Sequence, residues 1–257
     1  MCELSDTATM LTSASPSVAS ADRVLQVLAV LAQHGRAMSA SELIQKTGMA
    51  RSTLYRQLGR LKDWGFVSEI DASYAPGPLS LQLALGFDLA SNIMHAARPE
   101  METLSRQSSE SVGLIVAVND RAICLDMVES RHSLRCSFEK GRSVPLRDGA
   151  SAKCVLAHLP ELQRRAVLDM QHVPGSAEWR AADQTLAAIR EAGCAISAGE
   201  VDAGVWGSSA PVFAGPRHPV GAITLMAPIS RAQGQESALI QMTMIAATRI
   251  SRRLQAS

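Results

Sequence analysis

The chain has 257 residues, of which 47% are hydrophobic and 19% charged, and its formal net charge is +1. A chain of this length and hydrophobic content can bury a core of normal size, and the length fits two unequal domains. No apolar run reaches the roughly 18 to 20 residues of a membrane helix, and the N-terminus lacks a basic segment followed by an apolar one. We therefore expect a soluble, cytoplasmic protein without a membrane partner.

The cysteines are five in number and widely spaced, with no C-x-x-C pair. Zinc and redox sites in intracellular proteins commonly use such close pairs. We therefore expect no metal site and no cofactor, and we expect reduced, mostly buried thiols at Cys2, Cys124, Cys136, Cys154 and Cys194.

Charge is distributed unevenly along the chain. Residues 21–67 contain seven basic and three acidic residues, a net charge of +4, whereas the first 20 residues carry −2 and the rest of the chain −1. A small basic module on a near-neutral body suits phosphate contacts by one domain and a different task for the other.

The first 20 residues are rich in Ser, Thr and Ala without apolar periodicity, so residues 1–20 are predicted to form a disordered tail. Apolar residues at helical spacing then predict a first helix from Ala21 that stops at Gly35. Ser39 with Glu42 three residues later forms a capping-box pattern, which predicts a short second helix that ends at Gly48.

A third helix is predicted from Ala50 to Trp64, because Leu54, Leu58 and Leu61 share one face. Gly59, on the other side, either permits close approach of a neighbouring backbone or is simply tolerated. The outward surface carries hydrogen-bond donors and cations, which are the groups that reach base edges and phosphates: Ser52, Thr53, Tyr55, Arg56 and Arg60.

A hairpin follows, bracketed by Phe66-Val67 and Tyr74, with its tip predicted at Ser68 to Ser73. Three helices and a hairpin over residues 21–78 are typical of a winged helix-turn-helix, so we expect a sequence-specific DNA-binding regulator. The wing carries Glu69 and Asp71 but no basic residue, and should add little affinity. The expected contacts with double-stranded DNA are Arg23, Arg51, Ser52, Thr53, Tyr55, Arg56 and Arg60.

An apolar helix over residues 79–97 is predicted to connect the two domains and to pair with its copy in a second subunit, with Pro99 at its end or at a kink. A further helix is expected over 100–107. The rest of the chain then predicts an α+β domain over residues 98–257. Its strands are expected at 112–118, 122–127, 195–198, 205–212 and 220–226, and its helices at 150–158, 160–170, 181–192 and 233–254.

The sequence closely resembles the IclR family of bacterial transcription regulators, from about Ser17 onward. The matching stretches are Ser20 to Leu31, Ser39 to Gly48, Ser52 to Arg56, Gly65 to Val67, Val144 to Leu146, Ala150 to Lys153, Gly199 to Val205 and Ala210 to Val212. It departs from the family pattern at Pro76, which replaces the usual leucine, and in the acidic wing. The resemblance implies a DNA-binding module, a connecting helix and an effector-binding domain similar to GAF and PAS sensor folds.

By motif position, the resemblance carries effector contacts over to Gly149, Ala150, Ser197, Val205, Gly207, Thr224 and Met226. A helix that starts at Ala150 would offer free N–H groups and a positive dipole end to a carboxylate, so we expect a small organic acid as effector. Met226 and Val205 make one side of the site apolar, which favours an aromatic or branched acid. Alternatively, Ser197 and Thr224 satisfy only local backbone groups. Glu200 and Asp202 look like a catalytic pair but are interpreted as holding their own loop through backbone hydrogen bonds.

Two alternatives stay open at this point. The second domain could be a dimerisation unit that binds no ligand, in a homodimer or a tetramer. The chain could also be a hydrolase that pairs Cys154 or Cys136 with His158 or His132, because Cys154 and His158 stand four residues apart on one expected helix. The apolar run around Cys154 favours a buried structural thiol, so no catalytic residue is expected and a repressor is the default interpretation.

Overall fold

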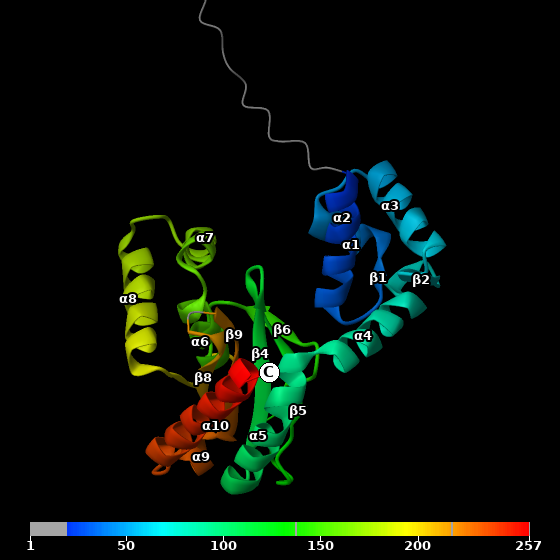
Figure 1. Cartoon of the computed structure of the whole chain (residues 1–257). Coiled ribbons are helices and arrows are strands. Elements are labelled where there is room, and N and C mark those ends of the chain that lie inside the picture. Colours follow the sequence, from blue (N-terminus) through cyan, green and yellow to red (C-terminus); the bar gives the residue numbers. More distant parts are fainter. Residues whose placement is uncertain (1–19, 137, 217, 257) are drawn as a thin grey trace, which may run out of the picture. The chain divides into compact units, whose positions relative to one another are not determined.

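The computed structural model describes residues 20–136, 138–216 and 218–256. It divides the chain into two compact units, Met1–Gly86 and Phe87–Ser257 (Figure 1). The predicted disordered tail falls on residues 1–19, outside the described residues, except for Ser20, which begins the first helix. Among the helices of the described ranges, none is long and apolar enough to cross a membrane.

Within residues 20–86, the first unit consists of three helices and a small sheet, followed by the start of a fourth helix. The elements are α1 (Ser20–His34), β1 (Met38–Ser39), α2 (Ala40–Thr47), α3 (Arg51–Asp63), β2 (Val67–Ile70), β3 (Ser73–Pro76) and α4 (Pro78–Ala90). The predicted capping box is present: the Ser39 hydroxyl accepts from the Glu42 amide, and the Glu42 carboxylate accepts from the Ser39 amide at 2.8 Å. Gly48 ends α2 in the left-handed conformation, at the start of the turn into α3.

The sheet of this unit is antiparallel in the order β1-β3-β2. Strand β1 was not predicted, because two residues are too few to show the alternation of apolar and polar side chains that marks a strand. The predicted tip at 68–73 is too long: residues 68–70 pair with β3, and only Asp71 and Ala72 turn, both at positive φ. Gly77 then passes so close to the chain that a Cβ there would collide with the Gly65 carbonyl oxygen.

The second unit is built on a six-stranded antiparallel sheet in the order β6-β5-β4-β9-β8-β7. Its strands are β4 (Ser111–Val118), β5 (Arg121–Val128), β6 (Ser143–Pro145), β7 (Ala195–Ala198), β8 (Val205–Gly215) and β9 (His218–Pro228). Its helices after α4 are α5 (Asn92–Ser108), α6 (Ala150–His158), α7 (Glu161–Gln171), α8 (Ala177–Ala192), α9 (Ile229–Ala232) and α10 (Glu236–Ala256). Strand β6 was not predicted.

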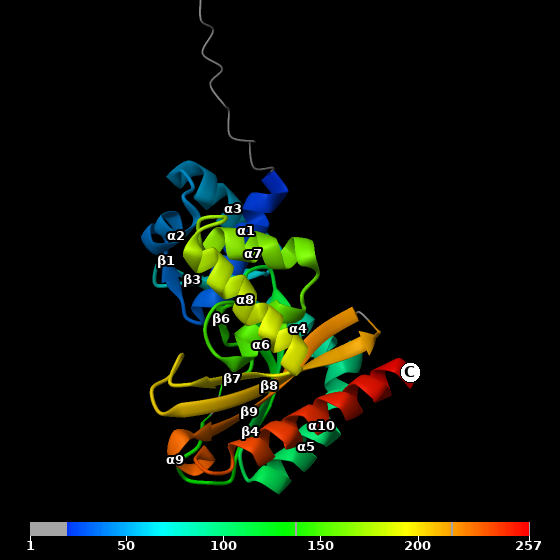
Figure 2. The ribbon, with the colours of Figure 1, turned by 90° about the vertical axis from the view of Figure 1, so that its left-hand side faces the viewer.

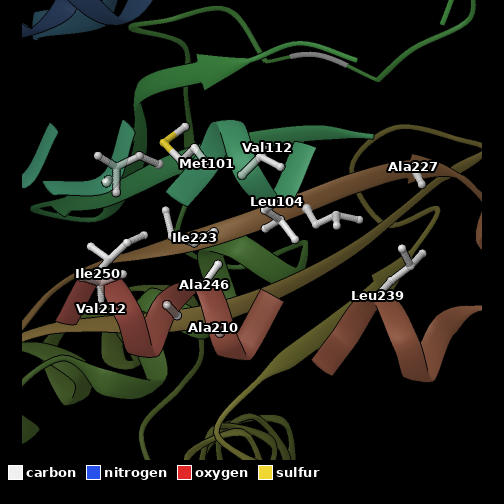
Figure 3. Close-up of a cluster of buried hydrophobic side chains, with 14 of the residues drawn as sticks. Met101, Leu104, Val112, Ala210, Val212, Ile223, Ala227, Leu239, Ala246 and Ile250 are labelled. Atoms are coloured by element: carbon white, nitrogen blue, oxygen red, sulfur yellow. The ribbon is translucent and has the colours of Figure 1, made fainter. Parts of the chain in front are cut away.

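Helices cover both faces of this sheet. Helices α5 and α10 lie side by side on one face, and α6 lies on the other with α7 and α8 beyond it (Figure 2). Alternate residues of β8 and β9 therefore enter two separate cores. The core under α5 and α10 includes Met101, Leu104, Val212, Ile223 and Ile250 (Figure 3). The α+β prediction is thus confirmed.

The predicted connecting helix over 79–97 is wrong as a single helix. Helix α4 ends at Ala90, Ser91 is extended, and α5 runs from Asn92 through Pro99 to Ser108. Ser and Asn favour helix starts over helix interiors, which accounts for the break. Pro99 does not end the helix, because packing of Ala97, Met101 and Leu104 against the sheet outweighs the roughly 3 kcal/mol that an interior proline costs.

Candidate functional site

Helix α3 presents a polar surface on the side away from its buried leucines. Leu54, Leu58 and Leu61 are at most 3% exposed and pack with α1 and α2. Of the predicted DNA contacts, two are half-buried, Arg23 and Thr53, and five are exposed: Arg51, Ser52, Tyr55, Arg56 and Arg60. The predicted contacts on α3 thus share one accessible surface with free donors.

The exposed side chains of α3 differ in how firmly they are held. The Arg51 guanidinium lies over the Tyr55 ring, 5.6 Å from its centroid, and the Arg60 guanidinium donates to the Ser20 hydroxyl at 3.3 Å. Arg56, in contrast, makes no hydrogen bond or ion pair within the described residues. Its side chain is free to extend toward a ligand such as a base edge.

The wing carries less free negative charge than its sequence indicates. The Glu69 carboxylate accepts hydrogen bonds from the Lys62 ammonium and, at 3.0 Å, from the Tyr74 hydroxyl. These hydrogen bonds, that from Lys62 foremost, lower the pKa of Glu69, while burial and the Glu69 contact raise the pKa of Tyr74 to about 12. Glu69 therefore ties the hairpin to the end of α3, which leaves Asp71 as the wing acid without an ion pair among the described residues.

A buried amide on α3 escaped the sequence analysis. Gln57 is completely buried, and neither its Oε1 nor its Nε2 atom has a hydrogen-bond partner among the described residues. Its position was a usable signal, because it lies three residues after Leu54 and four before Leu61, on the core face of the helix. An unpaired buried amide costs about 1–3 kcal/mol, so Gln57 weakens the unit that presents α3.

In the second unit, all seven predicted effector residues line one cavity between the start of α6 and the strands β7, β8 and β9. The cavity has a volume of about 30 Å³, which is roughly the space of one water molecule. Gly149 precedes α6 at φ +88°, and the Cγ2 atom of Val201 lies 2.7 Å from where a Cβ on Gly149 would be. The loop after β7 is therefore packed tightly over the start of α6.

The expectation of free N–H groups at the start of α6 is wrong for the first two amides. The Gly149 amide donates to Glu200 Oε2 at 2.9 Å, and the Ala150 amide donates to the Ser197 hydroxyl at 2.9 Å. The other Glu200 oxygen accepts from the Lys153 ammonium at 2.7 Å. Glu200 thus holds α6 rather than its own loop, a pairing across 51 residues that local reasoning could not detect.

Several polar groups around the cavity are already paired. The Thr224 and Ser209 hydroxyls lie 2.8 Å apart, so Thr224, like Ser197, has a hydrogen-bond partner from another part of the unit rather than from the local backbone. Ser151 is different: it is 6% exposed, lines the cavity, and makes no hydrogen bond through its hydroxyl within the described part of the chain. Phe138, which also lines the cavity, was missed because no local pattern marks its position, and Ser151 was missed although it lies in the family motif Ala150 to Lys153.

The cysteine and histidine of α6 do not form a catalytic pair. His158 Nδ1 lies 2.8 Å from the backbone carbonyl oxygen of Cys154 and not against its thiol. Cys154 is completely buried, and this burial raises the pKa of its thiol to about 12. A neutral thiol without an adjacent base is a poor nucleophile, so this pair lacks the geometry that a hydrolase needs.

Known proteins resemble this chain over nearly its whole length. Residues 20–70 match the family profile of the IclR helix-turn-helix domain, and residues 89–252 match that of the bacterial transcriptional regulator IclR C-terminal domain. The HTH-type transcriptional regulator Rv1719 of Mycobacterium tuberculosis is 31% identical over 84% of this chain and 85% of its own. The transcriptional repressor IclR of Escherichia coli is 27% identical over 85% of this chain and 83% of its own.

Solved structures share the fold. An IclR transcriptional regulator from Silicibacter sp. TM1040 superposes with a TM-score of 0.81 at 26% identity, covering 92% of this chain and 96% of that one. An IclR homolog from Microbacterium hydrocarbonoxydans, complexed with 4-hydroxybenzoate, gives a TM-score of 0.71 at 21% identity, covering 93% of this chain and 100% of that one. Together with the profile matches to both units, these likenesses show that the chain belongs to the IclR family of DNA-binding transcriptional regulators.

Proposed function

We propose that this chain is a ligand-responsive repressor that reads a specific DNA operator through α3. The observation that carries the proposal is the exposed row of donors on α3 opposite a fully buried leucine face. Arg56, together with Ser52, Thr53 and Tyr55, contacts base edges in the major groove, and Arg23, Arg51 and Arg60 contact phosphates or flanking positions. Repression follows when the bound protein blocks the promoter.

The repressor acts as a homodimer or as a tetramer of two dimers. Helix α4 supports this, because Leu81, Leu83, Leu85 and Phe87 are between 49% and 63% exposed in the single chain. A helix with so many exposed large apolar side chains is stabilised by a partner surface. Two copies of α3 then enter successive major grooves of a near-palindromic operator.

A small carboxylic acid with an apolar body is the proposed effector, bound in the cavity at the start of α6. The convergence of Gly149, Ala150, Ser197, Gly207 and Met226 on one cavity supports this site. The 4-hydroxybenzoate in the Microbacterium hydrocarbonoxydans homolog is an acid of this class. Binding changes the arrangement of the two DNA-binding units in the dimer and so changes operator affinity.

Two other interpretations have their own tests. If the second unit were only a dimerisation unit, no acid in a panel of aromatic and branched carboxylates would raise its unfolding temperature. If the chain were a Cys/His hydrolase, Cys154 or Cys136 would react quickly with a thiol alkylator in the native protein. We infer that the chain is not an enzyme, because Cys154 is completely buried and burial raises the pKa of both the Cys154 and the Cys136 thiol.

The test of the proposed function is Arg56→Ala with Arg36→Ala as its matched control. Both variants lose one exposed arginine, but Arg36 lies before α2 and pairs with Glu42. In gel-shift competition between DNA flanking the gene and unrelated DNA, Arg56→Ala should lose about 10-fold to 100-fold of its discrimination, the value of a specific base contact. Arg36→Ala should keep its discrimination. Equal discrimination in both variants would refute the role of Arg56.

A further inference from the structure

The proposed effector cavity is too small for its effector. At about 30 Å³ it is far below the roughly 300 Å³ or more of a typical small-molecule pocket. A second cavity of about 10 Å³ lies beside it, lined by apolar residues of β4, β5 and β6. Both cavities are lined by Phe138 and Ser151, so these two residues mark the boundary between them.

We propose that the chain occupies its own effector site: the Glu200 carboxylate takes the position of an effector carboxylate, and the Phe138 ring takes the position of its apolar body. An acid enters by replacing both side chains. This inference rests on the proposed function, because it concerns the same cavity. It adds how the ligand enters, by displacing two side chains, and names Ser151 as a further ligand contact.

Glu200 makes the contacts that a carboxylate ligand would make. It accepts from the Gly149 amide at the start of α6 and from the Lys153 ammonium, one oxygen to each donor. The Glu200 side chain is 36% exposed, so it can return to water without crossing the protein interior. A ligand carboxylate that replaces it keeps both donors paired, and the exchange leaves no buried charge unsatisfied.

Phe138 separates two apolar spaces that would otherwise be continuous. It lies between the space lined by Val205 and Met226 and the space lined by Ile115 and Val144. Withdrawal of its ring joins them into one slot next to the start of α6. The slot fits a flat or branched apolar group attached directly to a carboxylate.

Ser151 supplies a polar contact inside this slot. The residue is buried, and its hydroxyl makes no hydrogen bond among the described residues. Because Ser151 lines both cavities, its hydroxyl can donate to or accept from a ligand bound in the slot. A ligand oxygen, from the carboxylate or from a ring substituent, satisfies it.

Arg142 links the two side chains that must leave. Its guanidinium lies over the Phe138 ring, 4.8 Å from the centroid, and lies 3.8 Å from a carboxylate oxygen of Asp202, two residues after Glu200. Withdrawal of Phe138 therefore loosens the loop that carries Glu200. The site has a closed arrangement with both groups in place and an open arrangement with both removed.

The test uses the full chain with benzoate as probe, by isothermal titration calorimetry, for the parent protein, Glu200→Gln and Asp148→Asn. Glu200→Gln keeps the shape of the side chain but removes the competing charge, so benzoate should bind about tenfold more tightly, because apparent affinity scales with the fraction of open protein. Asp148→Asn removes a charge next to Gly149, but Asp148 pairs with Arg147 and should not compete. Weaker or unchanged binding by Glu200→Gln, or an equal gain in Asp148→Asn, would overturn the proposal.

Phe138→Ala tests the apolar half of the site. It should tighten the binding of benzoate more than the binding of acetate, which has a carboxylate and no ring, because acetate gains only from the larger open fraction. An equal gain for both acids would overturn the role of the ring. If benzoate and a panel of other aromatic and branched acids bind to none of these proteins, the effector class in the proposed function fails as well. If benzoate binds the parent as tightly as Glu200→Gln, only the self-occupied site fails.

Discussion

Two glycines of the DNA-binding unit should respond to alanine in opposite directions. At Gly59, inside α3, nothing lies within 4 Å of an added Cβ, so Gly59→Ala should stabilise the unit by about 1 kcal/mol through helix propensity alone. At Gly77, the added Cβ would collide with the Gly65 carbonyl oxygen and would lie 2.9 Å from the Val67 amide nitrogen. Both neighbours are backbone atoms, and the Gly77 amide itself donates to the Phe66 carbonyl oxygen at 2.7 Å. Relief requires the hairpin to shift, at a cost of about 1–3 kcal/mol or more.

Differential scanning calorimetry of the full chain measures both effects. For a unit of this size, each 1 kcal/mol moves the unfolding temperature by about 4–8 °C, so the same transition should rise in Gly59→Ala and fall in Gly77→Ala. A fall in Gly59→Ala would refute the argument from open space. The operator affinity of Gly59→Ala should be measured as well, because Gly59 lies on the side of α3 that is proposed to face DNA. If the DNA backbone approaches Gly59 closely, Gly59→Ala binds DNA more weakly although it is more stable.

Three further predictions concern the same unit. Gln57→Met should raise its stability by about 1–3 kcal/mol in urea unfolding, because an unpaired buried amide is replaced by an apolar chain of similar shape; a loss of stability would show that the amide has a partner. Asp71→Asn keeps a residue type that tolerates φ +49° and should tighten DNA binding at low salt, with the gain fading as salt is raised; equal affinity at low salt would contradict this. Hydrogen bonds from Ser39 and Arg36 lower the pKa of Glu42 from 4.5 to about 2, so its contribution to stability is present above pH 4.5 and lost as the pH falls toward 2. Unfolding temperatures of the parent and Glu42→Gln should therefore converge over that range, and parallel curves would refute the assignment.

The elements of the first unit could be predicted from the sequence because most of them depend on interactions between residues close together in the chain. The capping box at Ser39 and Glu42, the left-handed Gly48 and the leucine face of α3 each depend on residues within four positions of one another. Elements that depend on distant partners were missed or misplaced. Strand β1 exists only because Met38 and Ser39 pair with β3, 34 to 36 residues later, and α5 continues through Pro99 only because the sheet packs against it.

The effector cavity likewise combines residues that the sequence identified with contacts between distant residues that it did not. Motif resemblance identified seven residues that line one cavity, although they come from four separate elements and their flanks. What surrounds them could not be predicted, because Glu200 meets Gly149 and Lys153 across about 50 residues, and Phe138 reaches the site from a loop without periodic pattern. A sequence shows which groups could bind an anion, but not that another part of the chain already does so.

A ring and a carboxylate that leave together give the second unit two discrete states, which a switch requires. Within this unit, interactions continue from the site toward α5. The Arg142 carbonyl oxygen accepts from the Cys124 amide of β5, and Asp126, two residues further on that strand, accepts from Arg98 of α5 at 3.1 Å. Arg98 also donates to the Met127 carbonyl oxygen, so α5 is joined to β5 by both side-chain and backbone atoms. Withdrawal of Phe138 removes a contact of Arg142 and therefore acts on the strand to which α5 is fastened, and α5 follows α4 after one extended residue. A tenfold change in operator affinity needs only about 1.4 kcal/mol of difference between the two states, which is close to the contribution of a single hydrogen bond to a charged group.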